Sequence, residues 1–107
     1  MKISEPEDPA TATELDLLLE NGEVAIAVEV KARPSQKDVD EHARRMHKLR
    51  RYADKRQDRR RYQGAVAAAI LRESLRAYIL KQGFYLIEQA GDTVRINIPE
   101  GFKARDW

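Results

Sequence analysis

Two stretches near the start of the chain alternate between apolar and polar positions. In residues 13–20, Leu15, Leu17 and Leu19 fall on one side, and residues 23–33 repeat the alternation with valine and isoleucine. A period of two is typical of a β-strand with one buried face. The first third of the chain therefore predicts two strands.

The Asn21-Gly22 pair between these stretches predicts a tight hairpin, because both residues readily adopt the positive φ that such a turn needs. A two-residue turn pairs Glu20 with Glu23 and makes Asp16 a diagonal neighbour of Glu29. In that register four charged side chains project to one side of the hairpin, namely Glu14, Asp16, Glu29 and Lys31.

Helical spacing replaces the alternation after Pro34. Ser35 and Asp38 are spaced as a capping box, which indicates a helix N-terminus. Apolar residues then recur three, four or seven positions apart, which predicts an amphipathic helix to about residue 56. These positions are Val39, Ala43, Met46, Leu49 and Ala53.

The second half of the chain predicts one more buried strand, one helix and a final hairpin. Residues 64–71 form an uninterrupted apolar run of strand length, as expected of a strand covered on both faces. Residues 74–82 carry apolar positions at helical spacing, and Gly83 marks the end of that helix. Two further strands are predicted at residues 84–89 and 93–98.

The predicted order is strand, strand, helix, strand, helix, strand, strand. Each helix joins two strands as a crossover does, so we expect an α/β fold with a mixed, twisted sheet. The 107 residues suffice for one domain. Residues 1–12 are typical of an irregular lead-in, and residues 13–107 of the domain itself.

Composition excludes several classes of protein. No apolar run is long enough to span a bilayer, and no basic-then-apolar leader opens the chain, so we expect a cytoplasmic protein that does not bind membranes. The chain has no cysteine, which excludes disulfide scaffolds, thiolate metal sites and cysteine nucleophiles.

Charge is distributed unevenly. Residues 1–41 carry four Lys/Arg against eleven Asp/Glu, whereas residues 42–61 carry ten against two. One interpretation is a solvated surface that keeps the protein soluble. The other is a carboxylate-lined site beside a face that binds a polyanion. The basic residues that we expect to contact DNA are Arg44, Lys48, Arg51, Lys55, Arg59, Arg60 and Arg61.

The acidic side of the first hairpin is a candidate metal site. Carboxylates that converge repel one another unless a cation neutralises them, and Mg²⁺ prefers such oxygen ligands. Lys31 could orient a metal-bound water for attack on a phosphodiester, and Ala25 and Ala27 would leave room for a ligand. The alternative is a solvent-facing hairpin with weak cross-strand charge pairs.

Asp16, followed by Glu29-Val30-Lys31 on the next strand, then by a helix and an apolar strand, resembles the core of the PD-(D/E)XK, or restriction-endonuclease-like, nucleases. The segments at residues 13–42 and 83–102 also resemble uncharacterised prokaryotic proteins that carry such a domain behind a coiled coil. The resemblance covers residues 13–107. Two features depart from the family: Leu15 stands where its signature has proline, and residues 1–12 provide no evident first helix.

The resemblance implies a DNA phosphodiesterase that depends on Mg²⁺ or Mn²⁺. Asp16 and Glu29 would be metal ligands, the carbonyl of Val30 a third ligand and Lys31 the catalytic lysine, with Glu14 as a possible additional acid. The alternative is a catalytically inactive module of the same fold that binds nucleic acid or dimerises. Without the first helix we expect feeble cleavage by this chain.

The two predicted helices cannot cover both faces of a sheet, so we expect an apolar face that mediates a two-fold dimer. Other polar and aromatic residues have simpler interpretations. We expect His42 and His47 on the surface, Ser35 and Ser74 as helix caps, and three aromatic residues in the core: Tyr78, Phe84 and Tyr85. Trp107 could pack back on the domain or anchor a partner.

Overall fold

A computed structural model describes residues 17–107. It is a mixed α/β fold, as the sequence predicts, with one five-stranded sheet and two helices. The elements are β1 (Leu17–Glu20), β2 (Val24–Lys31), α1 (Gln36–Lys55), β3 (Arg61–Ala68), α2 (Glu73–Lys81), β4 (Tyr85–Ala90) and β5 (Thr93–Asn97).

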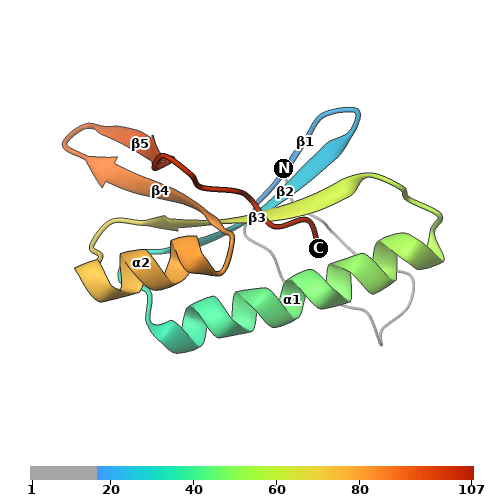
Figure 1. Cartoon of the computed structure of the whole chain (residues 1–107), viewed down its shortest axis with the longest axis horizontal. Helices are drawn as coiled ribbons and strands as arrows, with labels where there is room; N and C mark the ends of the chain where they lie inside the picture. Colours follow the sequence, from blue (N-terminus) through green and yellow to red (C-terminus); the bar gives the residue numbers. More distant parts are fainter. Residues whose placement is uncertain (1–16) are drawn as a thin grey trace.

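The strands lie in the sheet in chain order, β1 to β5. β2, β3 and β4 are parallel, and the two outer strands are antiparallel to their neighbours. Successive crossovers of one hand that advance in one direction leave their helices on one side of a sheet. Both α1 and α2 accordingly lie on the same side, which we call the helix side; the opposite side is the open side (Figure 1).

The core fills the space between the sheet and the helices. Phe84, Met46 and Ile79 are fully buried there, and α1 packs over Ala25 and Ala27, which have no exposed surface. The expectation that these two alanines leave room for a ligand is therefore wrong. Their small side chains instead let α1 approach the sheet closely.

The first hairpin has a different register from the predicted one. Leu17 pairs with Val28 and Glu20 pairs with Ala25, so the connection is two residues longer than a two-residue turn. The Asn21 side chain accepts hydrogen bonds from the backbone N–H groups of Glu23 and Val24, at 2.9 and 2.8 Å. Neither Asn21 nor its glycine neighbour has a positive φ.

This Asx-type turn competes with the tight turn because the asparagine carboxamide replaces a backbone acceptor. A shift by two residues leaves every side chain on its predicted side of the sheet, whereas a shift by one would reverse them all. The alternation thus grouped the residues by side correctly. The turn type was wrong, and the buried residue of β1 is Leu18 rather than a member of the leucine row that was expected to point inward.

The helix boundaries agree closely with the sequence pattern. Ser35 caps α1, and the reciprocal hydrogen bonds with Asp38 form the predicted capping box. Gly83 follows α2 with φ of 87°. Ser74, in contrast, is not a cap, because α2 begins one residue earlier, after Arg72. No helix among residues 17–107 is long and apolar enough to cross a membrane.

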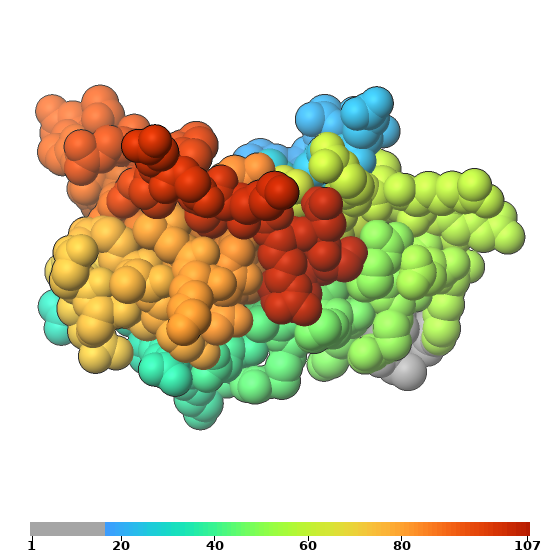
Figure 2. Space-filling model, viewed as in Figure 1, coloured from blue at the N-terminus to red at the C-terminus, as the bar shows by residue number. Residues whose placement is uncertain are grey.

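The C-terminal segment folds back on the domain, over the junction between α1 and the elements around α2 (Figure 2). The backbone N–H of Trp107 donates to the carbonyl of Tyr62 over 2.8 Å, and its ring stacks on Phe84 at 5.6 Å between centroids. The N–H of Arg105 bonds to the carbonyl of Gly83. Trp107 is therefore part of the fold.

Candidate functional site

Glu29 and Lys31 lie at the carboxyl end of β2, and both side chains project to the helix side. The parallel strands β2, β3 and β4 end at the same edge of the sheet, where sites of open α/β sheets are usually found. Glu88 of β4 projects to the same side, next to Ala68 of β3. The two predicted site residues of β2 are thus brought together at an edge suited to chemistry.

Glu29 is buried, with 7% of its surface exposed, and forms an ion pair with Arg45 of α1. A buried carboxylate needs such a cation, because an unpaired buried charge is costly. Arg45 was not predicted as a site residue. Its position three residues after His42, on the flank of α1 that meets the sheet, is the signal that could have revealed it.

Lys31 is half exposed, and its Nζ lies 3.9 Å from Oδ1 of Asp38 in the first turn of α1. The backbone N–H of Ser35 holds the pKa of Asp38 below its usual range, with its side-chain bond and Lys31 adding to the effect. The helix cap therefore supplies a carboxylate that tethers Lys31. Val30 projects its side chain to the open side and is 52% exposed.

Asp16 and Glu14, the other predicted acids, lie outside the described residues. Within residues 17–107, no three His, Asp or Glu side chains are grouped closely enough to hold a metal ion. Asp16 and Glu29 are the two metal ligands predicted to bind through their side chains. Of these two, Glu29 lies in the described part of the chain.

The prediction for His42 is wrong, whereas His47 is exposed as expected. His42 is fully buried on α1, where Nε2 donates to the carbonyl of Ala27 over 3.0 Å and the ring lies 5.0 Å from Phe84. The hydrogen bond to the backbone satisfies Nε2, as a buried polar atom requires. His42 therefore joins α1 to β2 at Ala27, which lies two residues before Glu29 along the strand.

The aromatic residues divide between three environments. Phe84 is in the core, as expected. Tyr78 is half-buried beside the core and donates a hydrogen bond to Asp40. Tyr85 lies instead on the open side, where its hydroxyl donates to Gln63 over 2.9 Å.

A second charged cluster lies at the opposite end of the sheet, around Arg60. Its guanidinium pairs with Asp58 at 2.7 Å and with Glu20 at 2.6 Å, and the Tyr62 hydroxyl donates to Asp58 at 2.8 Å. Hydrogen bonds from Arg60 hold the pKa of Asp58 well below its usual range, and burial raises the pKa of Tyr62 to about 12. Arg60 thus joins β1 to β3 and is the least available of the predicted DNA contacts.

The other predicted DNA contacts are exposed. Arg44, Lys48, Arg51 and Lys55 form one stripe on the outer side of α1, since they are three or four residues apart. Twenty residues of helix extend over roughly 30 Å. Arg59 is exposed beyond the stripe, and Arg61 is 57% exposed with Asp106 at 3.8 Å. We call the four residues on α1 the basic stripe.

Glu88 forms an ion pair with Arg76 of α2 rather than with a residue of the candidate site. The Arg76 guanidinium bonds to Glu88 at 2.6 Å and also pairs with Glu73, while the Asn97 amide donates to the other Glu88 oxygen. The hydrogen bonds from Arg76 lower the pKa of Glu88. These contacts fasten α2 to β4 and β5, so we assign Glu88 a structural role.

Comparison with known proteins finds no family model, no curated protein and no solved structure that matches the chain. The function of this chain must therefore be inferred from its own geometry and chemistry.

Proposed function

We propose that the protein is a metal-dependent DNA phosphodiesterase of the PD-(D/E)XK type, with its site at Asp16, Glu29 and Lys31. The observation that supports it best is the register of the first hairpin. Leu17 pairs with Val28, and the next residues beyond this pair in the sequence are Asp16 and Glu29.

Antiparallel pairing continued by one residue would set Asp16 directly opposite Glu29, with the two Cα atoms roughly 4.5–5.5 Å apart. Directly opposed residues project to one side, so both carboxylates would face one ion together with Lys31. The register in the structure thus favours a shared ion more strongly than the diagonal arrangement predicted from a two-residue turn.

The donor set suits the group that the proposal requires. Asp16 and Glu29 would hold Mg²⁺ or Mn²⁺ through carboxylate oxygens, which these hard cations prefer. Such an ion supplies an activated water and stabilises the leaving oxygen of the phosphodiester. Lys31, paired with Asp38, would orient the metal-bound water for attack on the phosphodiester. Arg45 pairs with Glu29 and compensates the charge of the buried carboxylate.

DNA is the proposed substrate because the basic stripe follows α1, whose first turns lie beside Lys31. Exposed arginine and lysine side chains along one helix neutralise successive phosphates without reading bases. A module that binds DNA without cleaving it is the second candidate. It is favoured by the surroundings of Glu29, because the carboxylate already pairs with Arg45.

Cleavage of supercoiled plasmid with Mg²⁺ or Mn²⁺ separates the two candidates. We expect slow nicking by the parent chain, abolished by EDTA and reduced on the order of 100-fold in Asp16→Asn, Glu29→Gln and Lys31→Ala. Glu23→Gln and Lys81→Ala are matched controls, because both side chains are exposed and distant from the site. They should nick at the parental rate.

Thermal melting with Mn²⁺ provides a second readout that does not depend on turnover. A cation that binds the folded carboxylate pair raises the melting temperature, and Asp16→Asn should remove that increase while Glu23→Gln retains it. DNA binding without nicking and without metal stabilisation would favour the second candidate. Nicking that persists unchanged in Asp16→Asn and Lys31→Ala would disprove the assignment of the site.

A further inference from the structure

The open side of the sheet is mostly apolar, although 36% of the residues of the chain are charged. Among the described strand residues that project to this side, Arg61 at the start of β3 is the one charged residue. Five large apolar side chains there are between 46% and 69% exposed. They are Leu19, Val30, Val94, Ile96 and Ile98.

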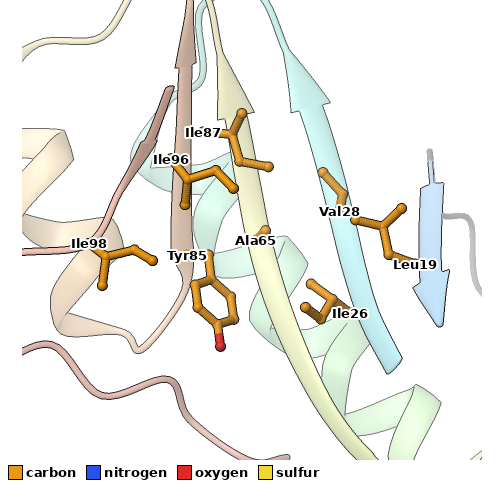
Figure 3. Close-up of a pocket in the computed structure, with 8 residues that line it drawn as sticks. All are labelled: Leu19, Ile26, Val28, Ala65, Tyr85, Ile87, Ile96 and Ile98. Carbon is orange, nitrogen blue, oxygen red and sulfur yellow. The ribbon is translucent and has the colours of Figure 1, made fainter. Parts of the chain in front are cut away.

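The open side is also shaped as a groove beside a ridge. Ala65 of the central strand β3 forms the floor, Leu19 and Ile26 line one wall, and Ile87 and Ile96 line the other (Figure 3). The groove encloses about 240 Å³. The isoleucine wall of β4 and β5 stands as a row of branched side chains beside the low floor.

We propose that this open side is the interface of a two-fold homodimer. A two-fold interface uses the same patch on both copies, so the patch must complement itself. The open side can meet this condition, because it carries both a groove over Ala65 and a row of isoleucine side chains beside it. In a face-to-face pair, the row of each copy would occupy the groove of the other.

The area of the exposed apolar patch on the open side agrees with a second copy of the chain as its partner. The five large apolar side chains expose about half or more of their surfaces, so they present on the order of 500 Å² per copy, within the range of the largest apolar patches on monomers. Two such patches would together bury on the order of 1,000 Å², which is about what a specific interface needs. Residues 1–16 are a poorer cover, since their large apolar side chains are Met1, Ile3 and Leu15 alone.

The proposal is independent of the nuclease assignment. Glu29, Lys31 and the basic stripe along α1 belong to the helix side or to the outer surface of that helix. Dimerisation through the open side therefore leaves them accessible, and either proposal can fail without the other.

Ile96→Lys tests the interface, and Ile70→Lys is its matched control. The two isoleucines are 57% and 56% exposed, but Ile70 follows β3 in the connection to α2 and lies outside the groove. Light scattering and sedimentation should give twice the 12.3 kDa chain mass for the parent and for Ile70→Lys. Ile96→Lys should raise the dimer Kd at least about tenfold, because it places a charge in an apolar interface.

Thiol labelling keeps the test decisive if Ile96→Lys does not fold. The chain has no cysteine, so Ile96→Cys and Ile70→Cys each introduce a single thiol. Raising the protein concentration should slow the labelling of Ile96→Cys and leave that of Ile70→Cys unchanged. A parent that stays monomeric, larger polydisperse particles, or equal weakening by both lysine variants would each overturn the proposal.

Discussion

Gly64 is the residue whose missing side chain matters most to the core. A Cβ at this position would lie 2.5 and 2.6 Å from ring carbons of Phe84, closer than such contacts occur. Because Phe84 is buried and stacked on Trp107, its ring has little freedom to move. Because Gly64 has no side chain, the Phe84 ring packs directly on the backbone of β3.

We expect Gly64→Ala to lower the free energy of unfolding by about 1–3 kcal/mol, the usual cost of overpacking a core. Gly22→Ala is the control, because nothing lies within 4 Å of the point where its Cβ would sit and its φ is not positive. Urea unfolding of both variants measures the difference. Equal stability of the two would show that Phe84 can move aside.

Individual polar residues were the least predictable part of the candidate site. His42 falls at an apolar spacing, three residues after Val39 and four before Met46, and that spacing indicates burial more reliably than its polarity indicates exposure. Its burial depends on a carbonyl of β2, which is a tertiary contact that no local pattern contains. The same holds for the pairing of Arg45 with Glu29.

The elements themselves were more predictable because their signals are local. The capping box fixed the start of α1, and the glycine after α2 fixed its end. β3 begins at Arg61, three residues before the predicted apolar run, because Arg61 and Tyr62 pair with β2 despite their polar atoms. The hairpin register depended on a side-chain hydrogen bond of Asn21, which the sequence alone left undetermined.

The start of α1 provides a prediction at this scale. Ser35→Ala removes the acceptor for the Asp38 N–H and the reciprocal arrangement of the capping box. We expect a loss of about 1 kcal/mol in the free energy of unfolding. Ser74→Ala should change stability by a few tenths at most, since Ser74 lies within α2 and makes no cap. Thermal melting compares the two; equal effects would contradict the role of the box.

The uneven charge of the chain becomes a spatial separation in the folded molecule. Most of the basic block of the sequence occupies the outer side of α1 and the loop that follows. Arg45, Arg50 and Arg60 bond within the protein, and Arg61 projects to the open side of the sheet, near Asp106. The sequence predicted the stripe but could not identify the arginines with structural roles, because their acceptors are contacts of the folded chain. Within residues 17–107, both helices lie on one side of the sheet, and neither covers its apolar open side.

Binding to duplex DNA should depend on the stripe and on salt. We expect Lys48→Ala combined with Arg51→Ala to reduce the slope of log affinity against log salt by about 2, because each neutralised phosphate contributes about 0.9. Lys81→Ala combined with Lys103→Ala removes the same charge elsewhere on the surface and should reduce the slope less. Fluorescence anisotropy over a range of KCl concentrations measures both. Binding that is insensitive to salt would contradict a phosphate-contacting stripe.

The packing of Trp107 gives the protein a built-in optical probe of its C-terminal segment. It is the sole tryptophan of the chain, and its indole is enclosed by Phe84, His47 and the guanidinium of Arg105, which lies 3.8 Å from the ring centroid. Emission excited selectively from tryptophan therefore comes from one place. Release of the tail would shift that emission to the red while the helical circular dichroism of α1 persists, so the two spectroscopies would resolve fraying of the terminus from global unfolding.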